Sequence, residues 1–174
     1  MTCKFALVVF CLFVVGYVDA ASDDLWKLLS ASDKFQLISR TYSLGASECA
    51  YMKVESRDQS THTLNTLMGF RDGTTKQYSQ PGSFTITVNG DQVTVRRASG
   101  STGVSYNLVY SDGQGCNILK GEKGGQRGDE CELWAPLGQE AHAQGSTCTA
   151  KFGEHCAAAV QHPYKADCQI PEPK

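Results

Sequence analysis

Short stretches in which apolar and polar residues alternate fill the middle of the chain, and they constrain the fold more than any other feature. Residues 84–88 alternate strictly, which is typical of a strand with one face in a core and one in solvent. Asn89-Gly90-Asp91 then supplies the positive φ angles of a tight turn, so residues 84–97 are predicted to form a β-hairpin. Further strands are predicted at 35–42, 48–56, 61–71, 103–110, 115–120 and 131–135. Eight short strands with tight turns predict an all-β domain, either an antiparallel barrel or a sandwich.

Two helices are predicted to flank the strands. Asp23 or Asp24 can cap a short apolar helix that includes Trp26. Residues 150–161 are rich in alanine, have apolar residues at helical spacing, and are followed by Pro163, which ends the segment.

The N-terminus has the organisation of a secretory signal peptide. Lys4 precedes an apolar run over residues 5–18, and Val18-Asp19-Ala20 offers small or aliphatic residues at both cleavage positions. The run is shorter than the roughly 20 apolar residues that a membrane span needs. We therefore expect a signal peptide over residues 1–20, a single domain over residues 21–174, and an exported protein.

Removal of that signal peptide leaves an even number of cysteines. The six that remain predict three disulfides, because the export compartment is oxidising. A structural zinc site would need Cys or His pairs at short spacing, and no Cys-x-x-Cys occurs. We therefore expect neither a metal nor a cofactor.

Charge and motifs exclude several classes of function. The net charge of −2 leaves no basic surplus for a nucleic acid, and there is no basic amphipathic helix for a membrane surface. Neither Gly-x-Ser-x-Gly nor His-Glu-x-x-His occurs, and every mature cysteine can pair. The prediction is a non-enzymatic protein that binds a small molecule, for which a barrel offers a cavity.

Motifs along the chain resemble the salivary lipocalins of ticks. Asp24-Leu25-Trp26-Lys27 is similar to the family's D-A-W-[KR], and Glu48-Cys49-Ala50-Tyr51 places a cysteine on the second strand. Cys116-Asn117-Ile118 is similar to C-D-[VIL]; 13 residues then lead to Glu132-Leu133-Trp134, and 13 more lead to Cys148. That stretch matches the family's biogenic-amine pattern except at one position. The cysteine layout is closest to the soft-tick (argasid) branch, and the resemblance spans Asp24 to Cys168.

The resemblance implies a fold, a location and a function. It implies an eight-stranded antiparallel lipocalin barrel with a C-terminal helix packed outside, secreted into saliva as a monomer. It implies sequestration of host mediators: histamine, serotonin or lipids such as leukotrienes and thromboxane. It also implies the disulfides Cys49–Cys168 and Cys116–Cys148, which leave Cys131 for Cys156.

The amine interpretation requires carboxylates and aromatic rings inside the barrel. A buried ammonium must be paired, and aromatic faces add cation–π contacts. Asp24 and Glu132 occupy the family's carboxylate positions, whereas Asn117 replaces its Asp. The candidate aromatic residues are Trp26, Phe35, Tyr42, Tyr110 and Trp134.

Other roles remain open for the same residues. Trp26 and Trp134 can instead plug the closed end of the barrel, and Asp24 can simply cap its helix. Glu132 can face solvent, but alternation puts it on the same face as Trp134, so both point inward or neither does.

Two further functions are compatible with the sequence. An anionic lipid would need an inward cation, for which the candidates are Arg40, Arg71, Arg96 and Arg97. Arg127-Gly128-Asp129, at the end of the glycine-rich segment 121–128, is the tripeptide of integrin ligands and predicts a platelet-inhibiting interaction as another alternative.

Overall fold

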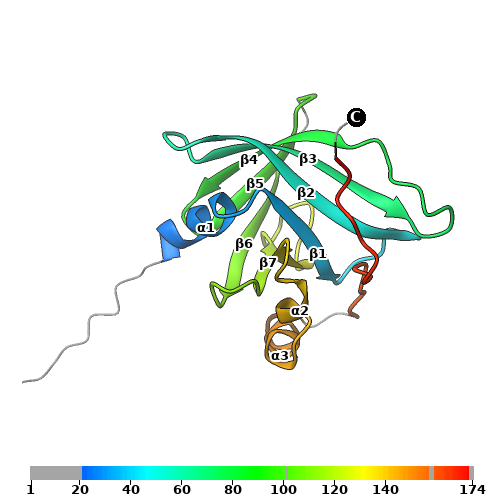
Figure 1. The fold of residues 1–174 in the computed structure, drawn as a ribbon. Helices are drawn as coiled ribbons and strands as arrows, with labels where there is room; N and C mark the ends of the chain where they lie inside the picture. The colour runs from blue at the N-terminus through cyan, green and yellow to red at the C-terminus, as the bar shows by residue number, and fades with distance from the viewer. Residues whose placement is uncertain (1–20, 101, 157–158, 173–174) are drawn as a thin grey trace, which may run out of the picture.

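Eight antiparallel strands close into a barrel in which each strand is hydrogen-bonded to its neighbours in sequence and β8 returns to β1 (Figure 1). The computed structural model describes residues 21–100, 102–156 and 159–172, and for residues 21–24 it describes the backbone alone. The number of strands refers to these residues. The predicted signal peptide lies outside them. The strands are β1 (Lys34–Arg40), β2 (Ser47–Asp58), β3 (Thr63–Asp72), β4 (Gly82–Asn89), β5 (Gln92–Arg97), β6 (Val104–Ser111), β7 (Asn117–Gly121) and β8 (Cys131–Pro136).

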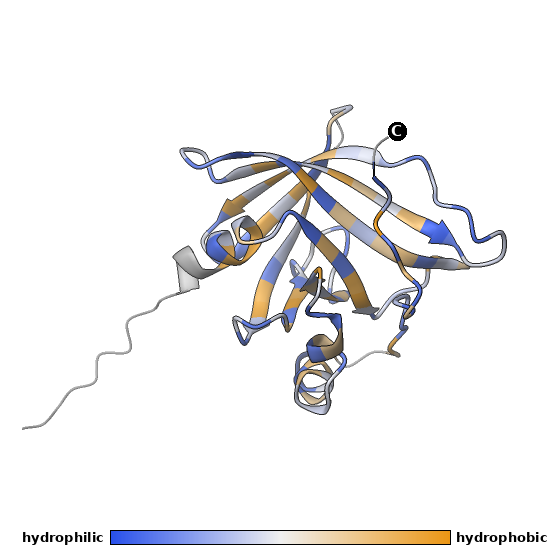
Figure 2. Ribbon diagram, in the orientation of Figure 1, coloured by the Kyte–Doolittle hydropathy of each residue, from blue (hydrophilic) through white to orange (hydrophobic). Residues whose placement is uncertain are grey.

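The predicted alternation sets the faces of the strands. Figure 2 shows apolar and polar residues alternating along the ribbon, and the apolar set forms the core inside the barrel. In the β4–β5 hairpin, Ile86 pairs with Val95 and Val88 with Val93. Gly90 has φ +66° in the turn between them, a conformation that favours glycine. The pairing of β8 with β1 decides between sandwich and barrel in favour of the barrel.

Register shifts interrupt the strand pairing at four places. Two lie in β2, between Glu48 and Tyr51 and between Val54 and Ser56. The others are β-bulges in β1 between Leu37 and Ser39, and in β6 between Leu108 and Tyr110. A bulge inserts a residue and reverses the facing of those that follow. The bulges in β1 and β6 decide which candidate side chains reach the interior.

A helix covers one end of the barrel. Helix α1 (Ala21–Ser30) packs Leu25, Trp26 and Leu29 into the core beside the turns that follow β2 and β4 (Figure 1). The opposite end is formed by the loops after β1, β3, β5 and β7. The barrel therefore has a covered end and a mouth.

The C-terminal helix lies outside the barrel, but its predicted bounds were wrong. Helix α2 (Glu140–Ala143) leads into α3 (Ser146–His155), which packs Phe152 against the outer face. The helix ends at His155: Cys156 is extended (φ −129°) and bonded to Cys131, and residues 159–161 are not helical, whereas residues 157–158 of the predicted helix lie outside the described residues. No helix among the described residues is long and apolar enough to cross a membrane.

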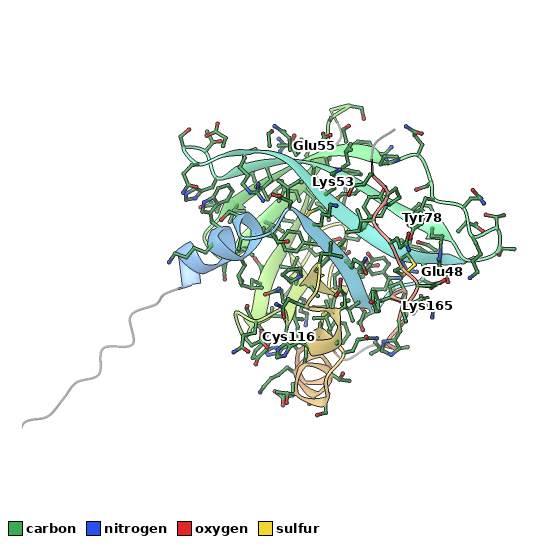
Figure 3. The ribbon with its side chains drawn as sticks, viewed as in Figure 1. Glu48, Lys53, Glu55, Tyr78, Cys116 and Lys165 are labelled. Carbon is green, nitrogen blue, oxygen red and sulfur yellow. A yellow bond between two sulfur atoms is a disulfide. The ribbon has the colours of Figure 1, made fainter. Side chains whose placement is uncertain are left out.

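Three disulfides brace the fold: the two pairs implied by the resemblance and the pair that those two leave. Cys49–Cys168 ties β2 to the C-terminal segment, whereas Cys116–Cys148 and Cys131–Cys156 tie β7 and β8 to the region of α3. The C-terminal segment runs along the outside of β1 and β2 (Figure 1), where Glu172 pairs with Lys34 and with Lys53, the latter labelled in Figure 3.

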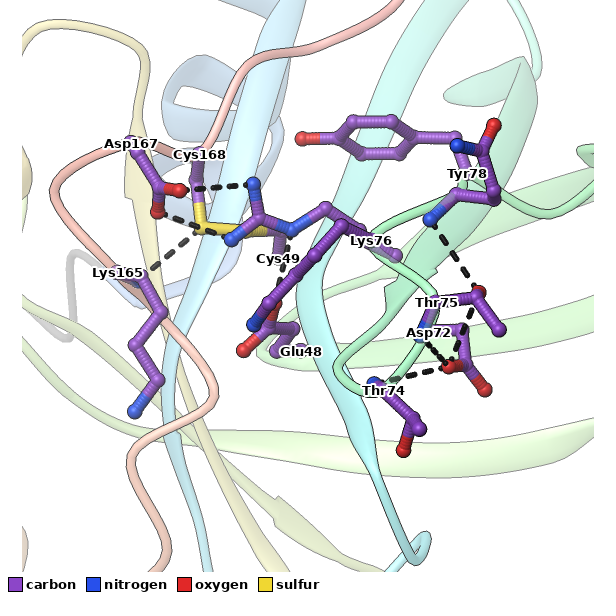
Figure 4. Close-up of polar contacts among 12 residues, drawn as sticks. Glu48, Cys49, Asp72, Thr74, Thr75, Lys76, Tyr78, Lys165, Asp167 and Cys168 are labelled. Carbon is purple, nitrogen blue, oxygen red and sulfur yellow. Dashed lines mark hydrogen bonds and ion pairs between the residues drawn. A yellow bond between two sulfur atoms is a disulfide. The ribbon is translucent and has the colours of Figure 1, made fainter.

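An ion network lies beside the Cys49–Cys168 disulfide, with Arg71 and Glu48 buried and Lys76 and Asp167 exposed (Figure 4). Arg71 Nε donates to Glu48 Oε1 over 2.8 Å, and its Nη1 and Nη2 donate to Asp167 over 3.0 and 2.9 Å. Lys76 Nζ donates to Glu48 Oε1 over 2.8 Å. Arg71, a candidate lipid-binding cation, is thus used to fasten the C-terminal segment to β2 and β3.

Candidate ligand-binding site

The interior of the barrel is divided into a narrow chamber and a wide one. The narrow chamber, of about 50 Å³, lies under α1 and is lined mostly by aliphatic side chains. The wide chamber, of about 520 Å³, opens at the mouth and has a more polar lining. The side chains that line both chambers are Met68, Val95, Tyr106, Glu132 and Trp134. These five residues form the junction between the chambers.

Glu132 places a buried carboxylate at this junction. It lies on β8, is 8% exposed, and faces inward together with Trp134 because the two are separated by one residue of a regular strand. Trp134 Nε1 donates to its Oε2 over 2.7 Å, and Tyr106 donates to its Oε1 over 3.2 Å. The hydroxyl of Tyr42, from the loop after β1, also donates to Oε1. The interpretation of Glu132 as a solvent-facing residue is therefore wrong.

Both tyrosines remain hydrogen-bond donors. Burial, reinforced by the neighbouring Glu132 carboxylate, raises the pKa of Tyr42 and of Tyr106 well above the ordinary phenol value. Their hydroxyls are therefore protonated at physiological pH and orient the carboxylate. Tyr106 was not singled out from the sequence, although its alternation with Leu108 would place it inside.

Asn117 lines the narrow chamber, but its amide is already engaged. Its Nδ2 donates to the carbonyl of Trp134, its partner across β7 and β8, over 3.2 Å. Its Oδ1 accepts from Ser111 over 2.8 Å. Asn117 therefore holds β6, β7 and β8 together beneath Glu132.

The predicted site residues at the covered end of the barrel have different surroundings. Phe35 lines the narrow chamber. Trp26 lines neither chamber: its ring stacks on His62 at 4.9 Å and its Nε1 donates to Gln59, so it plugs the covered end. Asp24 lies in α1, but its side chain is outside the described residues.

Tyr110 faces outward, contrary to the prediction. Leu108 points into the narrow chamber, and regular alternation would bring Tyr110 to the same face. The bulge between them turns Tyr110 to the outside, where its ring lies 6.1 Å from that of His155 on α3. It therefore packs the helix and lines no chamber.

Arg40 is a candidate cation for which the sequence did not predict whether the side chain points into the barrel or away from it. The bulge in β1 turns Ile38 and Ser39 outward and brings Arg40 to the wall of the wide chamber. It is 1% exposed and donates from Nη2 to the carbonyl of Ser47 over 3.1 Å. Arg97 also lines this chamber, whereas Arg96 is exposed and lines neither chamber.

Arg127 turns towards the mouth of the barrel. Its guanidinium lies 4.8 Å from the centre of the Tyr42 ring, and its Nη1 donates to Glu130 over 2.9 Å. Asp129 is exposed and lies 3.6 Å from the ammonium of Lys120. The two charged side chains of Arg127-Gly128-Asp129 are thus engaged within the protein, with Arg127 on the chamber wall.

The comparison with known families agrees with this geometry. The family described as tick histamine-binding protein matches residues 19–170, nearly the whole chain. The chain belongs to this family. Members of the tick histamine-binding family are binding proteins and not enzymes, which agrees with the absence of catalytic motifs from the sequence. No curated protein matches the sequence significantly.

Solved structures share the lipocalin barrel of this tick histamine-binding family member. AM182, in a complex with serotonin, is 22% identical with a TM-score of 0.59, over 83% of this chain and 92% of AM182. Japanin from Rhipicephalus appendiculatus, bound to cholesterol, is 14% identical with a TM-score of 0.61, over 79% and 95% of the two chains. Lobster apocrustacyanin A1 is 10% identical with a TM-score of 0.55, over 83% and 86%. Such identities show the fold alone.

Proposed function

We propose that this protein is a secreted salivary scavenger that captures a biogenic amine, histamine or serotonin, in its barrel and so suppresses host inflammation or haemostasis. The buried carboxylate of Glu132, at the junction of the two chambers, is the observation that carries the proposal. Family membership and the serotonin complex of AM182 support it. The three disulfides support export, with cleavage after Ala20.

The chemistry of the junction suits an ammonium group. A carboxylate offers about four lone-pair positions, and Tyr42, Tyr106 and Trp134 occupy three of them at Glu132. One position is left for a ligand donor, and a charge-assisted bond there would be about twice as strong as a neutral one. The rings of Tyr106 and Trp134 add faces for cation–π contact.

A lipid mediator such as a leukotriene or thromboxane is the second candidate function. The narrow chamber has an almost entirely apolar lining, and the buried guanidinium of Arg40 lies on the wide chamber. A ligand with a long apolar body and a carboxylate could use both features. The geometry favours integrin binding less, because the side chains of Arg127 and Asp129 are engaged within the protein.

Calorimetry of the mature protein, residues 21–174, tests the proposal. Histamine, serotonin and a leukotriene are titrated separately, and we expect saturable binding of at least one amine. Binding of the leukotriene with no heat from either amine would instead establish the lipid function. N-terminal sequencing of the secreted protein, with Ala21 expected first, tests the export signal.

A further inference from the structure

Arg40 is a buried cation with unsatisfied hydrogen-bond donors, and it lies between the wide chamber and a third pocket of about 360 Å³ that Ser47 and His162 also line. Ser47 satisfies its Nη2, but its Nε and Nη1 are buried without a partner. Leaving the donors of a buried charged group unpaired is costly, so such groups normally find an acceptor. Arg40 therefore points to an acceptor that the chain itself does not supply.

Glu132 is the carboxylate paired with Arg40 across β1 and β8, yet it accepts no hydrogen bond from Arg40. It is the Cα partner of Arg40 across β1 and β8, and both side chains are buried. Its hydrogen bonds come instead from Tyr42, Tyr106 and Trp134. Arg40 thus acts on Glu132 through its positive potential: burial lowers the pKa of Arg40, and the charges of Tyr42 and Glu132 oppose that shift.

Tyr42 connects the two charged groups. Its hydroxyl donates to Glu132, while the guanidinium of Arg40 lies 5.6 Å from the centre of its ring. The cation and the carboxylate are therefore neighbours on one wall, without a direct ion pair.

The wide chamber has the room and the lining for an organic anion. Its volume is about 520 Å³, and its walls include the rings of Tyr51, Phe84 and Trp134. Arg97 and Arg127 also line it: the guanidinium of Arg97 lies 5.4 Å from the centre of the Phe84 ring, and that of Arg127 donates to Glu130. An oxyanion group can accept from Nε and Nη1 of Arg40 once the buried guanidinium turns towards the chamber, while its organic body covers the rings.

We propose that the wide chamber binds an organic oxyanion at Arg40 while Glu132 binds an amine, and that each ligand strengthens the binding of the other. The inference rests on the proposed function for its amine half. The anion is defined by chemistry: a carboxylate, phosphate or sulfate on an apolar body. The two ligands would then share the barrel as a pair of opposite charge.

The coupling follows from electrostatics at close range. Without an anion, the potential of Arg40 opposes the approach of an ammonium to Glu132, and low dielectric in the buried wall strengthens that opposition. An anion on Arg40 neutralises the guanidinium and removes the opposition. Linkage requires that the amine raise the affinity for the anion by the same factor.

The test is a calorimetric titration of the unmodified mature protein with serotonin and with histamine, in chloride buffer at constant ionic strength. Each titration is repeated with saturating sodium octanoate, sodium acetate or sodium phosphate. We expect octanoate to raise amine affinity at least about fivefold, the lower end of ordinary coupling. Equal effects of acetate or phosphate would assign the site to the oxyanion alone, whereas an effect of octanoate only would show that the apolar body is needed as well.

Three results are distinguishable. Unchanged amine affinity with every anion overturns the coupling and leaves the amine function standing. Reduced amine affinity with octanoate overturns it as well, because the ligands would then compete for one space. Octanoate binding without any amine binding refutes the proposed function, and the two-ligand inference with it.

A matched pair of variants locates the effect. Arg40→Gln keeps a donor for the Ser47 carbonyl but removes the charge, so octanoate should no longer change amine affinity, and amine affinity without anion should rise. Arg96→Gln removes an exposed guanidinium from outside the chambers and should leave the coupling intact. Retained coupling in a folded Arg40→Gln protein, with its melting temperature measured alongside, contradicts the assignment to Arg40.

Discussion

The indole of Trp134 donates a 2.7 Å hydrogen bond to the carboxylate of Glu132, two residues earlier on the same strand. Side chains at this spacing lie on one face of a strand, so a single short motif supplies both the acceptor and a donor that orients it. Tyr42, from the loop after β1, and Tyr106, from β6, donate hydrogen bonds to the other carboxylate oxygen. Glu132 is therefore held in place before any ligand arrives, as effective binding sites require.

Replacing Glu132 by Gln should weaken amine binding much more than it disturbs folding. Removing one partner of a buried charge pair typically costs about 3–5 kcal/mol of the interaction. The new amide must also face a donor from Tyr42, Tyr106 or Trp134, which should lower stability by about 1–3 kcal/mol. Calorimetry and urea unfolding measure the two effects. Glu55→Gln, on the exposed part of β2 (Figure 3), is the control. A folded Glu132→Gln protein with wild-type amine affinity would show that the ammonium binds elsewhere.

Tyr42→Phe tests whether the ligand competes with the protein's own donors. The substitution keeps the ring between Arg40 and Arg127 but removes the hydroxyl that donates to Glu132. A second acceptor position becomes free, so amine affinity should rise by up to about fivefold, the equivalent of about 1 kcal/mol. Tyr106→Phe should have a smaller effect, because its bond of 3.2 Å is longer. Weaker binding in both variants would mean that the hydroxyls assist the ligand.

Regular alternation made much of the fold and part of the site predictable from the sequence. The eight strands lie close to their predicted ranges, and the spacing of Glu132 and Trp134 indicated their common face. The prediction that Tyr110 points inward was wrong because a bulge follows Leu108. Nothing in the sequence from Asn107 to Tyr110 indicates an extra residue. A bulge depends on how the neighbouring strand pairs, which is a property of the assembled sheet.

The remaining site residues could not be predicted for related reasons. Arg40 reaches the chamber only because of the bulge in β1, and Tyr42 reaches Glu132 from a loop whose path is set by tertiary contacts. The C-terminal helix was predicted several residues too far along the chain, because the helix propensity of alanine favoured the residues after Cys156. Cys156, bonded to Cys131, has an extended backbone, and Gln161 pairs with Arg40 in a β-bridge, so neither of these two positions is helical.

Acid should destabilise the protein partly through Glu48. Its hydrogen bond from Lys76, and then that from Arg71, hold the pKa of Glu48 below the ordinary 4.5 (Figure 4). A carboxyl with a lowered pKa stabilises the fold fully above its ordinary pKa and loses that contribution as pH falls through the lowered value. Glu48→Gln should therefore reduce the unfolding free energy at neutral pH and flatten its decline towards about pH 3, whereas Glu55→Gln should not. An unchanged acid slope in Glu48→Gln contradicts the assignment.

The disulfides should differ in their contribution to stability. Cys49–Cys168 closes a sequence separation of 119 residues, whereas Cys131–Cys156 closes 25. Loop-closure entropy then predicts about 5 kcal/mol for the first and about 3.5 kcal/mol for the second. The alanine double variant of Cys49 and Cys168 should unfold at lower urea than that of Cys131 and Cys156. The reverse order would show that packing around the helix outweighs chain entropy.

Asn117→Asp restores the charge that the family's amine pattern carries, but the structure changes the expected outcome. A carboxylate there can still accept from Ser111, yet its second oxygen would face the carbonyl of Trp134, to which the amide now donates over 3.2 Å. That repulsion and the nearby Glu132 should raise the pKa of the introduced carboxyl. Protonated, it would donate to Trp134 and leave stability near that of the wild type.

The sign of the pH dependence follows from this raised pKa. A carboxyl whose pKa is raised by folding stabilises the protein at low pH and loses that contribution as pH rises through the folded value. The Asn117→Asp variant should therefore lose stability relative to the wild type as pH rises, and in the same interval gain amine affinity by up to about fivefold, the equivalent of about 1 kcal/mol. Melting temperature and calorimetry across that pH range measure both effects. Asn107→Asp, at a half-buried position of β6 that lines neither chamber, controls for the added charge. A variant whose amine affinity stays at the wild-type value while its stability falls with pH would show that the ammonium does not reach Asn117.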